Sequence, residues 1–347
     1  MGRKIKKKKS ELPMFIVLLM MVGVAAFVYK SNMIPDYRYL FQKEEDDKTT
    51  PYYSLKAAPG TADGRTASPP SPNLELDFSA SHDFSDTITP DKLNSPNAIL
   101  IHLKDQTILM EKSSEEKIYP ASLTKIMTTI VAIENLSNLK EEIKLTNSTF
   151  QGLYEAGASM AGFQPGEHVM AIDLLYGVML PSGAECCIGL AEQIAGSEQN
   201  FVKMMNEKAA ELGMKSTHFE NTTGLHNENH YTTVNDLAIL LSDALQNNTF
   251  REIFTSSRYS TAPTNKHPGG MTFYSTMFEG LSNQNLIDGE ILGGKTGYTD
   301  EAGLCLASLA RVGKQEYILI SAGAKGDHHS EQYNITDALT VYNSMGE

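Results

Sequence analysis

The 347-residue sequence predicts an α+β fold, in which helices pack on an antiparallel sheet. Three observations support this class. Two strand-like segments on either side of the turn KDQ predict a hairpin at 98–112, apolar residues at helical spacing dominate 171–246, and strand-like segments return at 293–324. Strands, then helices, then strands are typical of an antiparallel sheet covered by helices. A hydrophobic content of 41% and a charged content of 20% fit a chain with a substantial core.

The first 29 residues predict a membrane anchor. Segment 1–11 contains six Arg and Lys residues between positions 3 and 9, and the 18 residues of segment 12–29 carry no charge. An uncharged stretch of this length is at the lower limit for a spanning helix, and the basic segment before it would stay in the cytoplasm. The expected product is a single-pass protein of the cell membrane whose remaining residues are extracytoplasmic. The alternative is a secreted protein, because VAA at 24–26 resembles a signal-peptide cleavage site.

Residues 30–92 predict a disordered extracytoplasmic linker. They include EEDD at 44–47 and PGTADGRTASPPSPN at 59–73, and such a composition cannot bury enough apolar surface to fold alone. The chain has a net charge of −13, and without the six basic residues at 3–9 the remainder carries −19. A body this acidic is a poor partner for nucleic acid, so we expect none. The folded domain is expected at 93–347.

The folded domain begins with strands predicted at 98–103 and 107–112, followed by a helix over 119–134 (YPASLTKIMTTIVAIE). Lys125 occupies the turn where a capping box has Glu or Gln and where the helix dipole disfavours a cation. Three residues apart on a helix, Ser122 and Lys125 would lie within reach of each other. Burial would lower the pKa of Lys125, and an uncharged amine could take the proton of the Ser122 hydroxyl. The simpler alternative is a capping serine beside a solvent-facing lysine.

The remaining elements are predicted from apolar periodicity and from helix-end signals. Helices are expected at 171–180, 184–195, 198–212, 234–246 and 331–343, and strands at 293–299, 304–312 and 316–324. The turn Pro181-Ser182-Gly183 would present the Ser182 hydroxyl at the start of the helix 184–195. The alternative is that Ser182 only caps this helix.

Segment 293–299 (GGKTGYT) predicts a strand able to accept an extended ligand. Gly293, Gly294 and Gly297 would let another backbone approach. A bound peptide could pair with this segment as an added strand, while Lys295 and Thr296 attract its carboxylate. The alternative is a glycine-kinked edge strand with a solvated lysine.

Three short motifs occur in a fixed order, each in a distinct structural context. They are Ser-x-x-Lys at 122–125, Ser-Gly-x at 182–184 and Lys-Thr-Gly at 295–297. This arrangement resembles the penicillin-recognising serine acyl-transferases, and in particular the low-molecular-weight penicillin-binding proteins, which are serine D-alanyl-D-alanine carboxypeptidases. PASLTKIMT, MLPSGAE and HFENTTGLHNENHYTTVNDLA (218–238) carry the same resemblance. It covers about residue 95 to the C-terminus and implies the serine β-lactamase and transpeptidase fold, with about five strands, helices on both faces and a helical subdomain.

The resemblance also implies a role for each matching residue. Ser122 would attack the carbonyl of the penultimate D-alanine of a peptidoglycan stem peptide, with Lys125 as its base, and Ser182 would pass a proton to the leaving D-alanine. The implied substrate-binding residues are Lys295, Thr296, Gly297 and Tyr298, and the backbone N–H groups of residues 122 and 298 would form the oxyanion hole. β-Lactam antibiotics would acylate Ser122. No cofactor and no metal are expected.

Ala184 departs from the family pattern, which has Asn at this position of the second motif. The asparagine would hydrogen-bond the base lysine and the substrate amide, and Glu185 points about 100° away round the helix. Two alternatives therefore stay open. One is a weakly catalytic or non-catalytic penicillin-binding or wall-sensing module. The other, ranked below it, is a β-lactamase, which would need a deacylating carboxylate and normally a Ser-Asp-Asn motif.

Two features favour a structural interpretation. Cys186, Cys187 and Cys305 are expected to be buried without forming a disulfide framework. His226 and His230 stand four residues apart, a spacing that binds zinc on a helix, but they lie in an Asn-rich loop segment.

Overall fold

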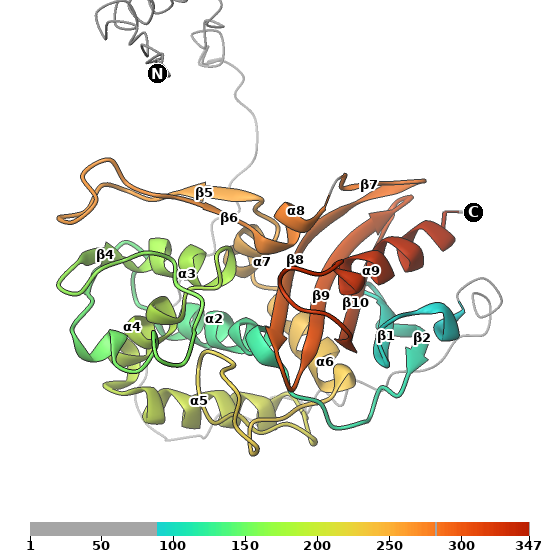
Figure 1. Cartoon of the computed structure of the whole chain (residues 1–347), viewed down its shortest axis with the longest axis horizontal. Helices are drawn as coiled ribbons and strands as arrows, with labels where there is room; N and C mark the ends of the chain where they lie inside the picture. Colours follow the sequence, from blue (N-terminus) through green and yellow to red (C-terminus); the bar gives the residue numbers. More distant parts are fainter. Residues whose placement is uncertain (1–88, 282, 347) are drawn as a thin grey trace, which may run out of the picture. The chain divides into compact units, whose positions relative to one another are not determined.

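Six strands form one antiparallel sheet in the order β2-β1-β10-β9-β8-β7 (Figure 1). The computed structural model describes residues 89–281 and 283–346. The strands are β1 Asn97–His102, β2 Thr107–Lys112, β7 Asn285–Leu286, β8 Gly289–Thr299, β9 Gly303–Val312 and β10 Gln315–Ala324. The expected number was about five, and the additional strand is β7, which has only two residues and pairs with the start of β8. The segments expected at 1–11 and 12–29, and the linker up to residue 88, lie outside the described residues.

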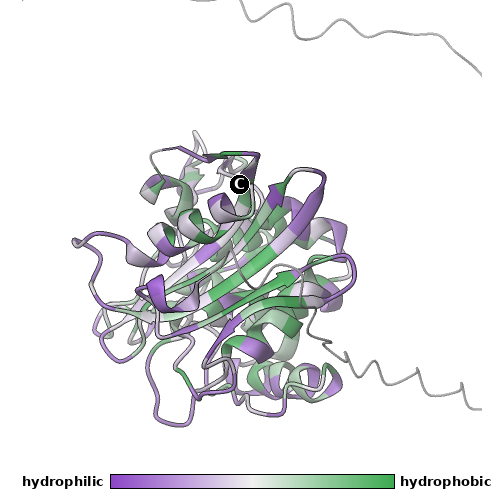
Figure 2. Cartoon of the chain, turned by 90° about the vertical axis from the view of Figure 1, so that its right-hand side faces the viewer, coloured by the Kyte–Doolittle hydropathy of each residue, from purple (hydrophilic) through white to green (hydrophobic). Residues whose placement is uncertain are grey.

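Both faces of the sheet are apolar and covered by helices, as the resemblance implied. On β1, Ile99 and Ile101 belong to the core on one face, whereas Ala98 and Leu100 belong to the core on the other. Helix α6 (Val234–Ala244) packs against β1 and β10 on the first face, and α9 (Tyr333–Ser344) packs against β9 and β10 on the second. Figure 2 shows the hydrophobic central strands with helices on either side. Burial on both faces explains why these strands read as nearly continuous apolar runs.

The helical subdomain follows the predicted boundaries within two residues for α3 to α6, whereas the helix predicted at 119–134 begins five residues later, at Thr124. Its helices are α2 Thr124–Asn135, α3 Ala171–Met179, α4 Ala184–Ala195, α5 Glu198–Glu211, α6 and α7 Asn248–Phe254. Polar caps set three of the starts. Ser197 accepts from the backbone N–H of Asn200, and Thr233 accepts from that of Asp236. Asn247 caps α7 in the same way. At the end of α4, Gly196 adopts the left-handed conformation, with φ 75°.

Several short elements were not predicted. They are β3 Glu142–Lys144, β4 His168–Met170, β5 Arg258–Ser260, β6 Thr272–Tyr274, α8 Thr276–Gly280 and the seven-residue helix α7. Strands of three residues contain too little alternation to be recognised. The three cysteines are buried and unpaired, as expected. Across residues 89–281 and 283–346, none of the helices is both long enough and apolar enough to cross a membrane.

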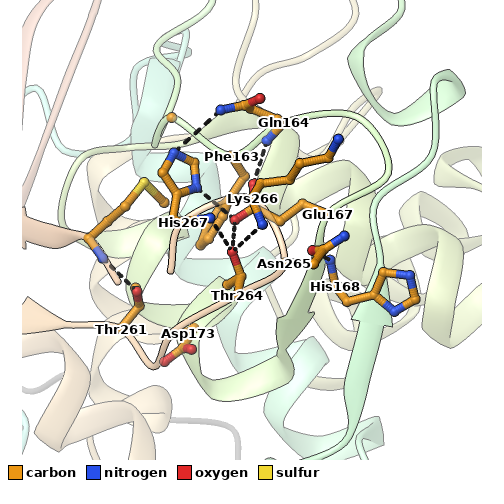
Figure 3. Close-up of polar contacts among 12 residues, drawn as sticks. Phe163, Gln164, Glu167, His168, Asp173, Thr261, Thr264, Asn265, Lys266 and His267 are labelled. Atoms are coloured by element: carbon orange, nitrogen blue, oxygen red, sulfur yellow. Dashed lines mark hydrogen bonds and ion pairs between the residues drawn. The ribbon is translucent and has the colours of Figure 1, made fainter. Parts of the chain in front are cut away.

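A buried carboxylate joins the β5–β6 hairpin to the segment before β4 (Figure 3). Glu167 accepts hydrogen bonds from the backbone N–H of Gln164, from the hydroxyl of Thr264 and, at 2.7 Å, from Nδ1 of His267. The carboxylate is fully buried, so these donors offset the cost of removing its charge from water. This cluster therefore stabilises the fold.

Candidate active site

Ser122 lies in a strained 3₁₀ turn, Ala121–Leu123, that leads into α2. Ala121 has a φ of 46°, in the left-handed region that residues other than glycine rarely adopt. Two contacts hold the turn. The Thr124 hydroxyl donates to the Ala121 carbonyl at 2.8 Å, and Gly224 packs so closely that a Cβ there would overlap the same oxygen. The N-cap of α2 is Leu123, so the interpretation of Ser122 as a cap is wrong.

Lys125 is buried and lies directly beside the Ser122 hydroxyl. Its Nζ is 3.2 Å from Ser122 Oγ and donates to the Thr223 carbonyl at 2.6 Å. Only 2% of the residue is exposed, so the solvent-facing alternative is wrong. Burial lowers the pKa of Lys125, although negative charge on neighbouring Cys187 and Glu185 would act in the opposite direction. The pair has the geometry and the protonation tendency of a hydroxyl beside its base.

Ser182 forms a second serine–lysine pair, with Lys295. Ser182 has a φ of 66°, and its Oγ accepts a hydrogen bond from Lys295 Nζ at 3.0 Å. The N-cap of α4 is Gly183, so Ser182 does not cap this helix. Lys295 is 1% exposed and also donates to the Thr296 carbonyl at 2.9 Å. Burial lowers the pKa of Lys295 well below its usual value, and a positive charge on Lys125 would lower it further. The alternative of a solvated lysine is therefore wrong.

Strand β8 provides a free edge beside Ser122. Residues 293–299 pair with β9, whereas β7 pairs only with Gly289 and Glu290. Among the described residues, this part of β8 therefore has a strand partner on one side only. A Cβ built on Gly297 would lie 3.1 Å from the Ser122 backbone nitrogen, which places β8 against the strained turn.

Three of the four glycines of β8, at 293, 294 and 297, accommodate the chain's own groups, which differs from the expectation that they admit a ligand backbone. A Cβ on Gly293 would overlap the carbonyl oxygen of Phe254, and one on Gly294 would overlap Sδ of Met277 in α8. Gly297 faces the turn that carries Ser122. Their lack of side chains thus fixes how α7, α8 and the turn pack on the strand.

A cleft extends to both sides of Ser122. The loop half-cleft has a volume of about 400 Å³ and includes residues 156–159, 223–226 and 299–301. The α8 half-cleft has a volume of about 340 Å³ and includes Ser182, Thr276, Glu279, Thr296 and Gln332. Four residues line both halves, namely Ser122, Ser159, Tyr298 and His328. The cleft therefore joins the segments that carry Ser122, Ser182 and residues 296–298.

Ala184 lies in the wall of the loop half-cleft, where it leaves Lys125 without an asparagine partner. Glu185 does not replace that partner, as expected, because its Oε1 accepts the backbone N–H groups of Gly162 and Phe163. The Thr223 carbonyl, which the sequence analysis missed, positions the amine of Lys125 instead. Backbone acceptors of this kind leave no signature in residue types.

His230 supports the strained turn from behind. Because the Thr124 hydroxyl donates to Ala121, it accepts from His230 Nε2 at 2.9 Å, while Nδ1 accepts from the backbone N–H of Glu220. Burial lowers the pKa of His230 to about 4. Both ring nitrogens are thus engaged. No group of three or more His, Cys, Asp or Glu residues in the described part of the chain is arranged to hold a metal ion.

Comparison with known proteins shows which protein family the chain resembles. The sequence profile of the D-alanyl-D-alanine carboxypeptidase family matches residues 85–326. The chain is 35% identical over 233 residues to D-alanyl-D-alanine carboxypeptidase DacF of Bacillus subtilis, and 33% identical over 239 residues to DacC of Escherichia coli. Each match covers 66% of this chain, but only 57% and 56% of the respective relatives. The chain thus spans little more than half the length of these relatives.

Solved structures agree with the sequence comparison. The Streptomyces K15 DD-transpeptidase superposes with a TM-score of 0.65 at 26% identity, covering 74% of this chain and 98% of that protein. A D-alanyl-D-alanine carboxypeptidase from Mycobacterium tuberculosis shares the fold, with a TM-score of 0.63 at 24% identity over 72% of this chain and 90% of the other.

Proposed function

This chain belongs to the D-alanyl-D-alanine carboxypeptidase family, and from this premise we propose that it is a serine peptidase of the bacterial cell wall. Its substrate would be a peptidoglycan stem pentapeptide, from which it removes the terminal D-alanine. β-Lactams, which imitate the D-alanyl-D-alanine end, would acylate the same serine. One observation carries the proposal: the Ser122 hydroxyl lies in an open cleft, 3.2 Å from the amine of a buried lysine.

In the acylation step, Ser122 Oγ attacks the carbonyl carbon of the penultimate D-alanine while Lys125 Nζ accepts the hydroxyl proton. The negative oxygen of the tetrahedral intermediate is held by the backbone N–H groups of residues 122 and 298. The C–N bond then breaks, and the proton passes from Lys125 through the Ser182 hydroxyl to the departing nitrogen. An ester on Ser122 and free D-alanine result.

Deacylation reverses the roles of the same groups. A water molecule adds to the ester carbonyl after giving a proton to Lys125, the bond to Ser122 Oγ breaks, and the serine regains its proton. Before acylation the substrate would lie along the free edge of β8, with its terminal carboxylate near Lys295 and Thr296 and its backbone beside Gly297 and Tyr298. The carboxylate leaves with the D-alanine, so during deacylation only the acyl portion of the peptide would remain along this edge.

We also propose that residues 12–29 anchor the chain as a single-pass protein of the cell membrane, with the catalytic domain outside. The support is the uncharged 18-residue stretch that follows the basic segment 1–11. Full-length chain in a bacterial host should remain with the membrane fraction and keep its N-terminal segment in mass spectra. A soluble product that begins after residue 26 would indicate signal cleavage and secretion instead.

The catalytic proposal is tested with full-length protein purified in detergent. We expect a fluorescent penicillin to label it, and a pentapeptide ending in D-Ala-D-Ala to lose D-alanine, with both reactions abolished in Ser122→Ala. Ser148→Ala removes another hydroxyl, outside the residues that line the cleft, and serves as the matched control.

The same experiment separates the competing functions. Penicillin labelling without D-alanine release would indicate a non-catalytic binding module. Rapid hydrolysis of the penicillin would indicate a β-lactamase. Absence of both labelling and release would contradict the proposed function.

A further inference from the structure

A second threonine hydroxyl adjoins Thr296 in the α8 half-cleft. Thr276 Oγ1 lies 2.6 Å from Thr296 Oγ1, and both residues line the cleft together with Ser122 and Ser182. The two threonines come from separate elements, since Thr276 is the first residue of α8 and Thr296 belongs to β8. The motif Lys-Thr-Gly at 295–297 implied a role for Thr296 but none for Thr276.

The position of Thr276 is fixed by packing on two sides. Its backbone N–H donates to the Leu180 carbonyl at 3.2 Å, two residues before Ser182. The next residue, Met277, is buried against β8 at Gly294, where a Cβ would overlap its sulfur. Thr276 is thus held between the turn that carries Ser182 and the strand that carries Thr296. Its helix, α8, lies beside β8 in Figure 1.

The α8 half-cleft has no Lys or Arg among its described lining residues, so an anionic ligand there would depend on hydroxyl groups as hydrogen-bond donors. These lining residues include the carboxylate of Glu279 and the imidazole of His328. The amine of Lys295 lies behind this surface, buried and directed to Ser182 and the Thr296 carbonyl. A carboxylate placed here would therefore contact neutral donors first, and their orientation would decide how well it binds.

Two hydroxyl oxygens 2.6 Å apart form one hydrogen bond, in which one hydroxyl is the donor and the other is the acceptor. If Thr276 is the donor, the Thr296 hydroxyl is the acceptor and its own hydrogen must point elsewhere. A hydroxyl that accepts one hydrogen bond also becomes a stronger donor for the next. We propose that Thr276 is a positioning residue that donates to Thr296 Oγ1 and so directs the Thr296 hydroxyl hydrogen to the terminal carboxylate of the ligand. This inference rests on the proposed function, because it concerns the same substrate.

The test is a double-mutant cycle with Thr276→Val, Thr296→Val and the combined variant in the full-length protein. The readouts are the second-order rate of acylation by benzylpenicillin, which carries a carboxylate, and kcat and KM for D-alanine release. Thr276→Val should lower the acylation rate roughly five- to tenfold, the range expected for one neutral hydrogen bond, and should act mainly through KM. Thr276→Ser, which keeps the hydroxyl, should restore the rate to within about twofold.

The double-mutant cycle distinguishes a Thr276 that positions the Thr296 hydroxyl from a Thr276 that contacts the ligand independently. If Thr276 acts through Thr296, the double variant should be no slower than Thr296→Val alone. The matched control is Thr272→Val, which breaks the exposed Ser260–Thr272 hydroxyl pair on the β5–β6 hairpin and should change neither readout. Unchanged rates in Thr276→Val, or losses that multiply in the double variant, would overturn the inference.

The two readouts separate this inference from the proposed function. If wild-type protein releases no D-alanine but reacts with benzylpenicillin, the carboxypeptidase function fails while the cycle still tests the hydroxyl pair. If D-alanine is released and the losses multiply, only the inference about Thr276 fails.

Discussion

The two serine–lysine pairs of the cleft look alike but are built differently. Ser122 and Lys125 are 3.2 Å apart and belong to one turn and the helix that follows it. Ser182 and Lys295 are 3.0 Å apart and join the start of α4 to β8, across 113 positions of the chain. Both lysines are buried, and burial lowers the pKa of each.

The surroundings of the two hydroxyls assign different tasks to the pairs. Ser122 lines both halves of the cleft, so a substrate carbonyl can reach its Oγ. Ser182 is only 5% exposed and contacts the amine of Lys295. A buried lysine beside an accessible hydroxyl suits the generation of a nucleophile, whereas a buried lysine beside a buried hydroxyl suits proton transfer and ligand orientation. The comparison therefore predicts unequal consequences when each lysine is removed.

The largest effect is expected from Lys125→Met, which keeps the apolar stem and removes the amine. Acylation by penicillin should slow roughly 10²- to 10⁴-fold, because Ser122 loses its general base. Stopped-flow labelling measures the rate, and Lys203→Met on the exposed side of α5 is the matched control.

The pH dependence provides a second check on Lys125. Only the uncharged amine accepts a proton, so wild-type acylation should fall as the pH is lowered through the depressed pKa of Lys125. Equal rates for wild type and Lys125→Met at every pH would contradict the assignment of Lys125 as the base.

A smaller effect is expected on stability, through His230 behind the turn of the first pair. Its pKa is lowered from 6.5 to about 4, so the folded state binds fewer protons than the unfolded chain between these values. The resulting stabilisation is complete above pH 6.5 and is lost as the pH falls towards 4, by about 3 kcal/mol in total. Urea unfolding at both pH values should show a steeper loss in wild type than in His230→Gln. Parallel losses would show that this histidine does not couple folding to pH.

Lys295→Met tests the second pair. We expect acylation to slow about 10- to 100-fold, the range for a lost charge-assisted hydrogen bond, which is less than for Lys125→Met. The second-order rate with benzylpenicillin measures it, with Lys314→Met in the β9–β10 turn as control. A loss equal to that of Lys125→Met would remove the distinction between the two pairs.

The smallest effect is expected from Ala184→Asn. An amide at this position could contact the Lys125 amine and the substrate, and should raise the acylation rate roughly three- to tenfold. Acylation kinetics compared with Ala184→Ser, whose side chain is too short to reach as far, measure the gain. An unchanged rate would mean that the Thr223 carbonyl already positions the amine fully.

The sequence predicted the first pair from spacing alone, but not the second. One turn of helix brings residues 122 and 125 together whatever the rest of the chain does. Nothing local connects Ser182 to Lys295, so their meeting was anticipated only through the order of family motifs. Thr223 and Thr276 were missed, because one acts through a backbone carbonyl and the other through contacts that only the folded chain creates.

The elements of the fold also separate into those that local sequence patterns predicted and those that depend on long-range contacts. Long amphipathic helices such as α4 and strands buried on both faces such as β10 were located within two residues, because their apolar patterns span many positions. The β3–β4 and β5–β6 pairs depend on contacts such as the one between Glu167 and His267, which link residues 100 positions apart. The apolar periodicity of a short segment does not indicate contacts between residues so far apart in the sequence.

The central claim is that Ser122, and not Ser182, is the hydroxyl activated by its lysine. Mass spectrometry of a tryptic digest tests this directly, after brief reaction of the full-length protein with benzylpenicillin. Cleavage after Lys117 and Lys125 releases residues 118–125, whereas Ser182 falls in the separate peptide 145–203. We predict a penicilloyl adduct on 118–125 alone, located on Ser122. An adduct on the peptide 145–203, or no adduct on either, would contradict the claim.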